Sequence, residues 1–360
     1  MTNDEMKEIT DRLDKLTYKL GQIQAKLNSI EAGHAEPKEP PRKPRLKDIH
    51  AEKGYYADFP TSEEDDPDFK RKFIKLVRGL DEVSCKQITQ IIQRLRILKE
   101  STDDFLPEFS DDEMRRLEFV ENHFYPEILR VCEGCYSYNG YVLPVPTFEP
   151  SVFLDKCGLN EISAPEEIVH RDIIDAGAFV GDSSLLLSRL TSENVYAFEP
   201  TAKNYENLLK TIEMNKLKNV VPCKYALGSE KGTIDMTNAI VSSSNAFVEN
   251  SRMPYTATEK VDVITLDEFV EEHNLDVGLI KTDVEGAEQM LLKGAMKTIR
   301  RQRPTLLISI YHNASDFFGI KPKLEKLNVG YKFKIHRPVI GTVLMETMLI
   351  AESFGYYNEF

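Results

Sequence analysis

Residues 172–184 read Asp-Ile-Ile-Asp-Ala-Gly-Ala-Phe-Val-Gly-Asp-Ser-Ser, an apolar run that ends in an acid and a glycine. The pattern predicts a buried strand, a turn and then a helix, with Asp182 as a plausible cap. Ligands of open α/β sheets bind at such strand ends, and Gly177 and Gly181 would let a ligand approach the backbone closely. Their G-x-x-x-G spacing matches neither the dinucleotide fingerprint G-x-G-x-x-G nor the G-x-x-x-x-G-K-[ST] loop of nucleotide triphosphatases.

Strand-like and helical segments alternate from this stretch onward. Such alternation predicts a parallel sheet covered by helices on both faces. The last two strands, 331–336 and 346–352, are joined by a short connection around Gly341, so we expect them to pair antiparallel. The preceding strands are predicted at 170–176, 194–198, 220–226, 261–265, 277–282 and 305–311.

An acid follows the second of these strands. Glu199 lies 24 residues after Asp175, and an acid near that offset can accept hydrogen bonds from both ribose hydroxyls of an adenosine cofactor. Both acids could instead merely terminate strands and cap helices. The pair, with two glycines between its members, favours the cofactor.

Composition excludes several classes of protein. The 360 residues hold 46 Lys and Arg against 59 Asp and Glu, a net charge of −13 that argues against a nucleic-acid binder. The chain shows neither an apolar run long enough for a membrane span nor an apolar signal-peptide centre. Its five cysteines do not form a disulfide framework, and the C-x-x-C at 132–135 lacks the further ligands of a zinc site. We therefore expect a soluble cytoplasmic protein.

The N-terminal segment carries a heptad pattern. Apolar residues at alternating spacings of three and four predict a coiled coil over residues 1–32, and Leu at a with Ile at d favours a homotrimer or homotetramer. The alternative is an amphipathic helix packed on its own domain. Residues 33–68 are rich in proline and charge, which disfavours close packing and indicates an extended linker. The heptad seam consists of Met6, Ile9, Leu13, Leu16, Leu20, Ile23, Leu27 and Ile30.

Residues 69–160 predict a helical block with a hairpin. Apolar residues between Ile88 and Leu98 fall on one helical face. Ser110 and Glu113 form a capping box at the start of another helix, and Asn139-Gly140 is a hairpin signal. No catalytic motif is visible in this block, which would cap the following domain or extend its interfaces.

Five motifs carry a specific resemblance. They are the loop at 175–181, Tyr-Ala-Phe-Glu-Pro at 196–200, Leu-Gly at 227–228, Ile-Thr-Leu-Asp-Glu-Phe at 264–269 and Val-Gly-Leu-Ile-Lys-Thr-Asp-Val-Glu-Gly-Ala-Glu at 277–288. In this order they make residues 165–352 resemble FkbM-type S-adenosylmethionine-dependent methyltransferases. The resemblance implies that residues 161–360 form a class I methyltransferase domain. Its fold would be α/β and Rossmann-like, with seven mainly parallel strands and an antiparallel last strand.

The resemblance also implies a binding site for S-adenosyl-L-methionine. Glu199 would bind the ribose, Tyr225 and Ala226 would lie beside the adenine, and Asp283 would face the sulfonium and the acceptor. Asp175, Gly177 and Gly181 would line the methionine and sugar side. The full implied set is Asp175, Gly177, Ala178, Gly181, Asp182, Ser183, Glu199, Pro200, Tyr225, Ala226 and Asp283.

The candidate catalytic residues are Lys281, Asp283 and His312. A hydroxyl acceptor must lose its proton, which requires a general base or a metal. Lys281 and Asp283 share a face of their strand, and His312, which titrates near neutral pH, closes the next strand. We expect His312 to be the base, or to ligate a divalent cation such as Mg²⁺ alongside Asp283. The alternative is a structural histidine bonded to a backbone carbonyl. The family commonly has an acid near this position.

The expected function is therefore O-methylation, with a sugar hydroxyl of a glycan or glycoconjugate as acceptor. Methylation of a small-molecule natural product, or at nitrogen, stays open. So does a non-catalytic coiled-coil scaffold with a degenerate methyltransferase domain. An NAD-dependent dehydrogenase is disfavoured by the missing fingerprint. The polar run 242–245 could be a loop over the acceptor site or a plain turn.

Overall fold

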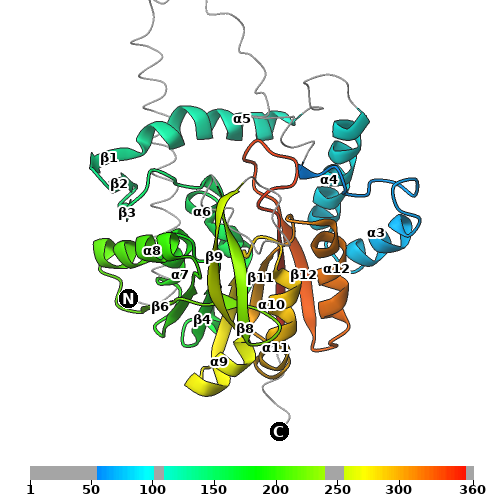
Figure 1. Ribbon diagram of the computed structural model, residues 1–360. Helices are drawn as coiled ribbons and strands as arrows, with labels where there is room; N and C mark the ends of the chain where they lie inside the picture. Colours follow the sequence, from blue (N-terminus) through cyan, green and yellow to red (C-terminus); the bar gives the residue numbers. More distant parts are fainter. Residues whose placement is uncertain (1–54, 101–108, 240–254, 354–360) are drawn as a thin grey trace, which may run out of the picture. The chain divides into compact units, whose positions relative to one another are not determined.

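A seven-stranded sheet forms the centre of the computed structural model, which describes residues 55–100, 109–239 and 255–353 (Figure 1). The heptad segment 1–32, most of the linker 33–68 and the polar run 242–245 lie outside the described residues, so the trimer or tetramer remains a prediction. The strands run in the order β12-β13-β11-β10-β4-β5-β6. In chain order they are β4 (Asp172–Ala176), β5 (Val195–Phe198), β6 (Val220–Cys223), β10 (Val277–Thr282), β11 (Thr305–Ser309), β12 (Tyr331–His336) and β13 (Met348–Ser353).

The pairing confirms the expected mixed sheet. Strands β11, β10, β4, β5 and β6 pair in parallel. Strand β13, the last in the chain, lies between β11 and β12 and is antiparallel to both. The connection from β12 to β13 is too short to hold a crossover helix, so antiparallel pairing is the arrangement open to these two strands.

A second sheet corrects one expectation. The segment 261–265 belongs not to the central sheet but to β9 (Tyr255–Ile264), which pairs antiparallel with β8 (Gly232–Ala239) and parallel with β7 (Ala226–Leu227). The expected strand at 220–226 correspondingly breaks between β6 and β7. The described residues hold no helix between β6 and β9, and parallel strands of a sheet such as the central one are usually joined by a crossover helix.

Helices cover both faces of the central sheet, as the near-continuous apolar strands predict. Ile174, Ile280 and Ile308 face one buried cluster, which includes residues of α9 to α12. Ile173 and Leu279 face the opposite cluster, which includes residues of α7 and α8. The helices are α7 (Asp182–Leu187), α8 (Ala202–Asn215), α9 (Leu266–His273), α10 (Glu288–Gly294), α11 (Met296–Gln302) and α12 (Ala314–Glu325).

Segments N-terminal to β4 pack against this core. Helix α4 contacts β12, and the Ser84 hydroxyl accepts a 2.9 Å hydrogen bond from the Ile335 N–H. The capping box of Ser110 and Glu113 is confirmed. The elements are α3 (Phe69–Val77), α4 (Glu82–Glu100), α5 (Asp111–Phe119), a π-helical turn (Val120–Phe124), β1 (Leu129–Cys132), β2 (Cys135–Tyr138), β3 (Tyr141–Leu143), α6 (Pro150–Phe153) and 3₁₀ turns at Tyr125–Glu127, Lys156–Glu161 and Pro165–Glu167. None of the described helices combines the length and apolar character needed to cross a bilayer.

Candidate active site

The turn between β4 and α7 is held against the neighbouring strand ends. The N–H groups of Gly177 and Ala178 donate to the Phe198 carbonyl at 3.0 and 2.9 Å. Gly177 has φ +77°, and a Cβ there would lie 1.8 Å from the Asp283 carbonyl oxygen. Only glycine fits this approach, so the turn and the end of β10 form one continuous edge.

The helix that follows starts one residue earlier than expected. Gly181, with φ +88°, is the N-cap of α7, and Asp182 is its first helical residue. The Asp182 carboxylate accepts the Ser183 N–H at 2.8 Å. Burial raises the pKa of Asp182 to about 7. The expectation that Asp182 caps the helix is therefore wrong, because the left-handed conformation at the cap is one that glycine adopts most readily.

Asp175 and Lys281 form a buried ion pair beneath this turn. They are partners in the parallel register of β4 and β10, and the Lys281 Nζ lies 3.3 Å from Asp175 Oδ1. The second Asp175 oxygen accepts from the Ser183 and Ser184 hydroxyls at 2.8 and 2.6 Å. Asp175 has no exposed surface, so its carboxylate faces the turn's own residues.

Lys281 is held in its charged form. Burial opposes the charge, but the carboxylates of Asp175 and Asp283 outweigh it and raise the pKa of Lys281 above its usual range. The ammonium donates to the Gly177 carbonyl at 3.0 Å. A charged lysine has no lone pair to accept a proton, so this position does not suit the catalytic base that the sequence suggested.

Glu199 closes β5, next to β4 in the sheet. Its Oε1 accepts the Thr201 N–H at 3.0 Å and the Thr201 hydroxyl at 2.5 Å. Burial raises the pKa of Glu199 to about 7, and the bonds from Thr201 oppose that shift only in part. Pro200 is half-buried, Tyr225 after β6 is 40% exposed, and Ala226 is buried at the start of β7. The neighbouring strands β10, β4, β5 and β6 thus end at Asp283, Gly177, Glu199 and Tyr225 along one sheet edge.

Asp283 is a partly exposed acid at this edge. Its side chain is 23% exposed, and its Oδ1 accepts a 3.2 Å hydrogen bond from the Tyr311 hydroxyl. The same hydroxyl lies 3.1 Å from Glu346 Oε1. Burial, together with the charges of Asp283 and Glu149, raises the pKa of Glu346 to about 8.

His312 lies beside Asp283 but is enclosed by acids. The ring is 3% exposed, with Nε2 3.4 Å from Asp283 Oδ1 and 3.6 Å from Glu285 Oε2. The other ring nitrogen, Nδ1, is 3.0 Å from Glu288 Oε1. Burial disfavours the charged ring, but Glu288 and Glu285 outweigh it and raise the pKa of His312 well above its ordinary value. With so little of the ring exposed, the geometry does not favour His312 as the base that the sequence suggested.

Four residues of this cluster were missed in the sequence. Neither Glu285 nor Glu288 was assigned a role from the sequence, although both follow Asp283 closely and Glu288 opens α10. Tyr311 precedes His312 and could have been considered with it. Glu346 carries no local signal, because a distant loop brings it to the Tyr311 hydroxyl. One carboxylate oxygen each of Asp283 and Glu285, and a ring nitrogen of His312, lie within 4.8 Å of one another.

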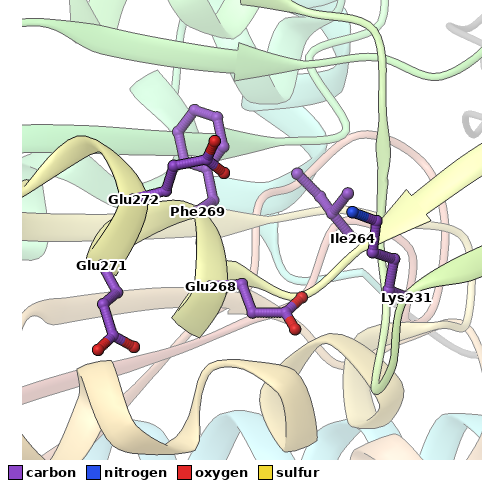
Figure 2. A pocket seen from close by; sticks show the side chains of 6 residues that line it. All are labelled: Lys231, Ile264, Glu268, Phe269, Glu271 and Glu272. Carbon is purple, nitrogen blue, oxygen red and sulfur yellow. The ribbon is translucent and has the colours of Figure 1, made fainter.

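A separate pocket of about 360 Å³ lies beside α9. Figure 2 shows its α9 side chains on one side and those of Lys231 and Ile264 on the other. None of its lining residues was expected at the site. They are Lys231, Ile264, Glu268, Phe269, Glu271 and Glu272.

Comparison with known proteins finds methyltransferases that resemble this chain. Residues 175–344 match the family model of the methyltransferase FkbM domain. Methyltransferase 1 of Beauveria bassiana (strain ARSEF 2860) is 26% identical over 223 residues, which cover 56% of this chain and 87% of that protein. Methyltransferase sdnD of Sordaria araneosa is 27% identical over 196 residues, covering 46% of this chain and 74% of that protein.

A solved structure agrees with the fold. The crystal structure of methyltransferase FkbM from Methylobacillus flagellatus KT superposes with a TM-score of 0.50 at 17% identity. The match covers 78% of this chain and 58% of that protein's length. The match favours an active methyltransferase over the two alternatives that the sequence left, a non-catalytic scaffold and an NAD-dependent dehydrogenase. Residues 175–344 therefore match the methyltransferase FkbM domain, and the chain is an S-adenosylmethionine-dependent methyltransferase.

Proposed function

We propose that the enzyme methylates a hydroxyl oxygen of a sugar, in a glycan or glycoconjugate. One observation carries the proposal: Asp283, whose backbone carbonyl abuts the Gly177 turn, has a partly exposed carboxylate that accepts from Tyr311 at 3.2 Å. This placement puts a proton acceptor directly beside the turn that faces the cofactor. Asp283, Glu346 and Tyr311 also offer hydrogen-bond acceptors to the several hydroxyls of a sugar.

The residues at the sheet edge fit S-adenosylmethionine. Glu199, at the end of β5, has an acid's capacity to accept from two ribose hydroxyls. The partly exposed Asp283 carboxylate lies at the acceptor side, which suits the positive sulfonium. When bound, the cofactor supplies an activated methyl group, so the protein chiefly positions the reactants and manages a proton.

We assign the roles of the chain's residues as follows. Asp283 takes the acceptor's proton, because its carboxylate is partly exposed and its backbone adjoins the Gly177 turn. Tyr311 and His312 orient its carboxylate through contacts of 3.2 and 3.4 Å. Asp175 and Lys281 position the turn from below. We also propose that a divalent cation assists at Asp283 and His312, as the sequence suggested.

The test is methyl transfer by the full chain to a panel of oligosaccharides, hydroxylated small molecules and amines. We expect methylated sugar hydroxyls, identified by mass spectrometry and NMR. Asp283→Asn should lower kcat by about 10²- to 10⁴-fold, the range for loss of a general base. Its affinity for S-adenosylhomocysteine should stay within about threefold of wild type, which corresponds to less than about 1 kcal/mol of binding free energy.

Asp262→Asn is the matched control, since Asp262 is an exposed acid on β9. It should keep the wild-type rate. Methylation confined to amines would overturn the assignment of a hydroxyl acceptor. Methylation confined to hydroxylated natural products would overturn the assignment of a sugar as the acceptor. An Asp283→Asn enzyme with wild-type kcat would remove Asp283 as the proton acceptor.

A further inference from the structure

We propose that Asp283, Glu285 and His312 bind one divalent cation, Mn²⁺ or Mg²⁺, and that Glu288 orients the imidazole toward it. The inference deepens the proposed function, because it rests on the acceptor site assigned there. It adds a ligand, Glu285, and a positioning residue, Glu288, to the pair that the sequence suggested.

The spacing of the three side chains suits one ion. The His312 Nε2 lies 3.4 Å from Asp283 Oδ1 and 3.6 Å from Glu285 Oε2, and all three atoms fall within 4.8 Å. Adjacent ligands of an octahedral ion at about 2.1 Å are separated by about 3.0 Å. Small side-chain rotations therefore bring these atoms to coordination distance.

The His312 ring provides an independent indication of a ligand. It is 3% exposed, and neither ring nitrogen meets hydrogen-bond geometry with any atom of the described residues. Buried polar atoms normally have a partner. The Nε2 atom is directed at two carboxylates, and a cation held between them would provide that missing partner.

Glu288 lies beside the His312 ring nitrogen that would not bind the metal, so it can orient the imidazole. It has no exposed surface, and its Oε1 accepts the Val284 N–H at 3.0 Å, which holds the carboxylate in place. The same oxygen is 3.0 Å from His312 Nδ1. A proton on Nδ1 would therefore face Glu288, and a cation would replace the proton on Nε2, the arrangement common around metal-bound histidines.

Charge favours a dication. The carboxylates of Asp283, Glu285 and Glu288 gather around a single imidazole. Buried like charges need a counter-charge, and a dication supplies it between the two carboxylates that act as ligands. Carboxylates select hard ions, and the one imidazole nitrogen makes Mn²⁺ a better match than Ca²⁺.

The cation would act on the acceptor without changing its own oxidation state. The acceptor hydroxyl would lose its proton more readily when its oxygen is coordinated. The O–H bond breaks and its proton passes to the site's base or to water. The oxygen then forms the new C–O bond, as the C–S bond of the cofactor breaks and its electron pair stays on sulfur.

The test measures Mn²⁺ binding to metal-free full-length protein by electron paramagnetic resonance, without cofactor or acceptor. We expect one ion per chain. Glu285→Gln and Glu288→Gln should each weaken binding by about 10- to 100-fold, as loss of a ligand or of its orienting partner does. Glu272→Gln, a control for an exposed acid on α9, should leave it unchanged. Glu285 is partly exposed, so its variant remains informative if Glu288→Gln fails to fold.

The outcomes separate this proposal from the proposed function. Absence of Mn²⁺ binding to the wild type, or unchanged binding in Glu285→Gln, would overturn the metal site. Full hydroxyl methylation after removal of metal with EDTA would overturn it too, and would leave the proposed function intact. Specific Mn²⁺ binding by an enzyme that methylates no hydroxyl would support the site and overturn the function.

Discussion

Glu199 shows how burial sets the behaviour of a single carboxyl group. It is 5% exposed, and the lost hydration raises its pKa to about 7 despite the bonds from Thr201. The charged form is the one that accepts from two ribose hydroxyls. Near neutral pH the unliganded protein therefore holds Glu199 in a mixture of both forms.

We expect the affinity for S-adenosylhomocysteine to rise with pH through about 7 and then level off. In the ribose-binding role proposed for Glu199, binding below the raised pKa must first remove its proton, so affinity falls by up to about tenfold per pH unit. Calorimetric titrations at about pH 6 and pH 8 measure the slope. Glu199→Gln should bind about tenfold or more weakly at the higher pH, since it loses charge-assisted hydrogen bonds.

The variant also tests the assignment of the pH dependence. Glu199→Gln should show a flat profile, because its amide does not titrate. Burial raises the pKa of Asp182 to about 7 as well. A slope that survives in Glu199→Gln would contradict the prediction and point to Asp182.

At the scale of elements, β4 and β10 support the site through one cross-strand pair. Parallel register places Lys281 opposite Asp175, and both side chains are buried. The lysine also donates to the Gly177 carbonyl. The pair of strands thus fixes the position and direction of the turn that we propose faces the cofactor.

Lys281→Met should destabilise the protein by about 3–5 kcal/mol, because it leaves the buried Asp175 carboxylate without its partner. Urea unfolding measures the free energy. The double variant Asp175→Asn with Lys281→Met should recover part of the loss, since no unpaired charge remains. A single variant within about 1 kcal/mol of wild type would show that the pair does not support the strands in this way.

At the scale of the whole molecule, a buried ion cluster joins the N-terminal helices to the end of the sheet. Glu113 of α5 receives two hydrogen bonds from Arg94 of α4, at 2.8 and 2.6 Å. It also pairs with Arg337, which directly follows β12. Burial opposes ionisation, but these bonds and the bond from Ser110 outweigh it and lower the pKa of Glu113 to about 2.

We expect Glu113→Gln to lower the free energy of unfolding by about 3–5 kcal/mol, because two buried guanidinium groups lose their counter-charge. The pKa is depressed in the fold, so this stability is present above the ordinary value of 4.5 and is lost as pH falls toward about 2. Acid and urea titrations measure both effects. Glu118→Gln on the exposed face of α5 is the control, and an equal loss there would contradict the prediction.

Local patterns in the sequence predict much of the architecture. Apolar runs locate β4, β10 and β11 to within a few residues, since a strand buried on both faces must be apolar throughout. The short connection around Gly341 predicts the antiparallel pairing of β12 and β13. Gly177 and Glu199 mark strand ends as sites for a ligand. Each inference needs only neighbouring residues, because the spacing of apolar residues and the residue types that favour turns are local properties of the sequence.

The sequence by itself thus determined the succession of strands and helices along the chain, the turn at Gly177 and the acids at the strand ends. Only the tertiary structure placed β9 in a second sheet, set Lys281 against Asp175 and enclosed His312 among Glu285 and Glu288. The physical reason is that burial and charge depend on which distant segments meet. The order of the strands within the sheet and their register decide those contacts, and no periodicity within one segment encodes them.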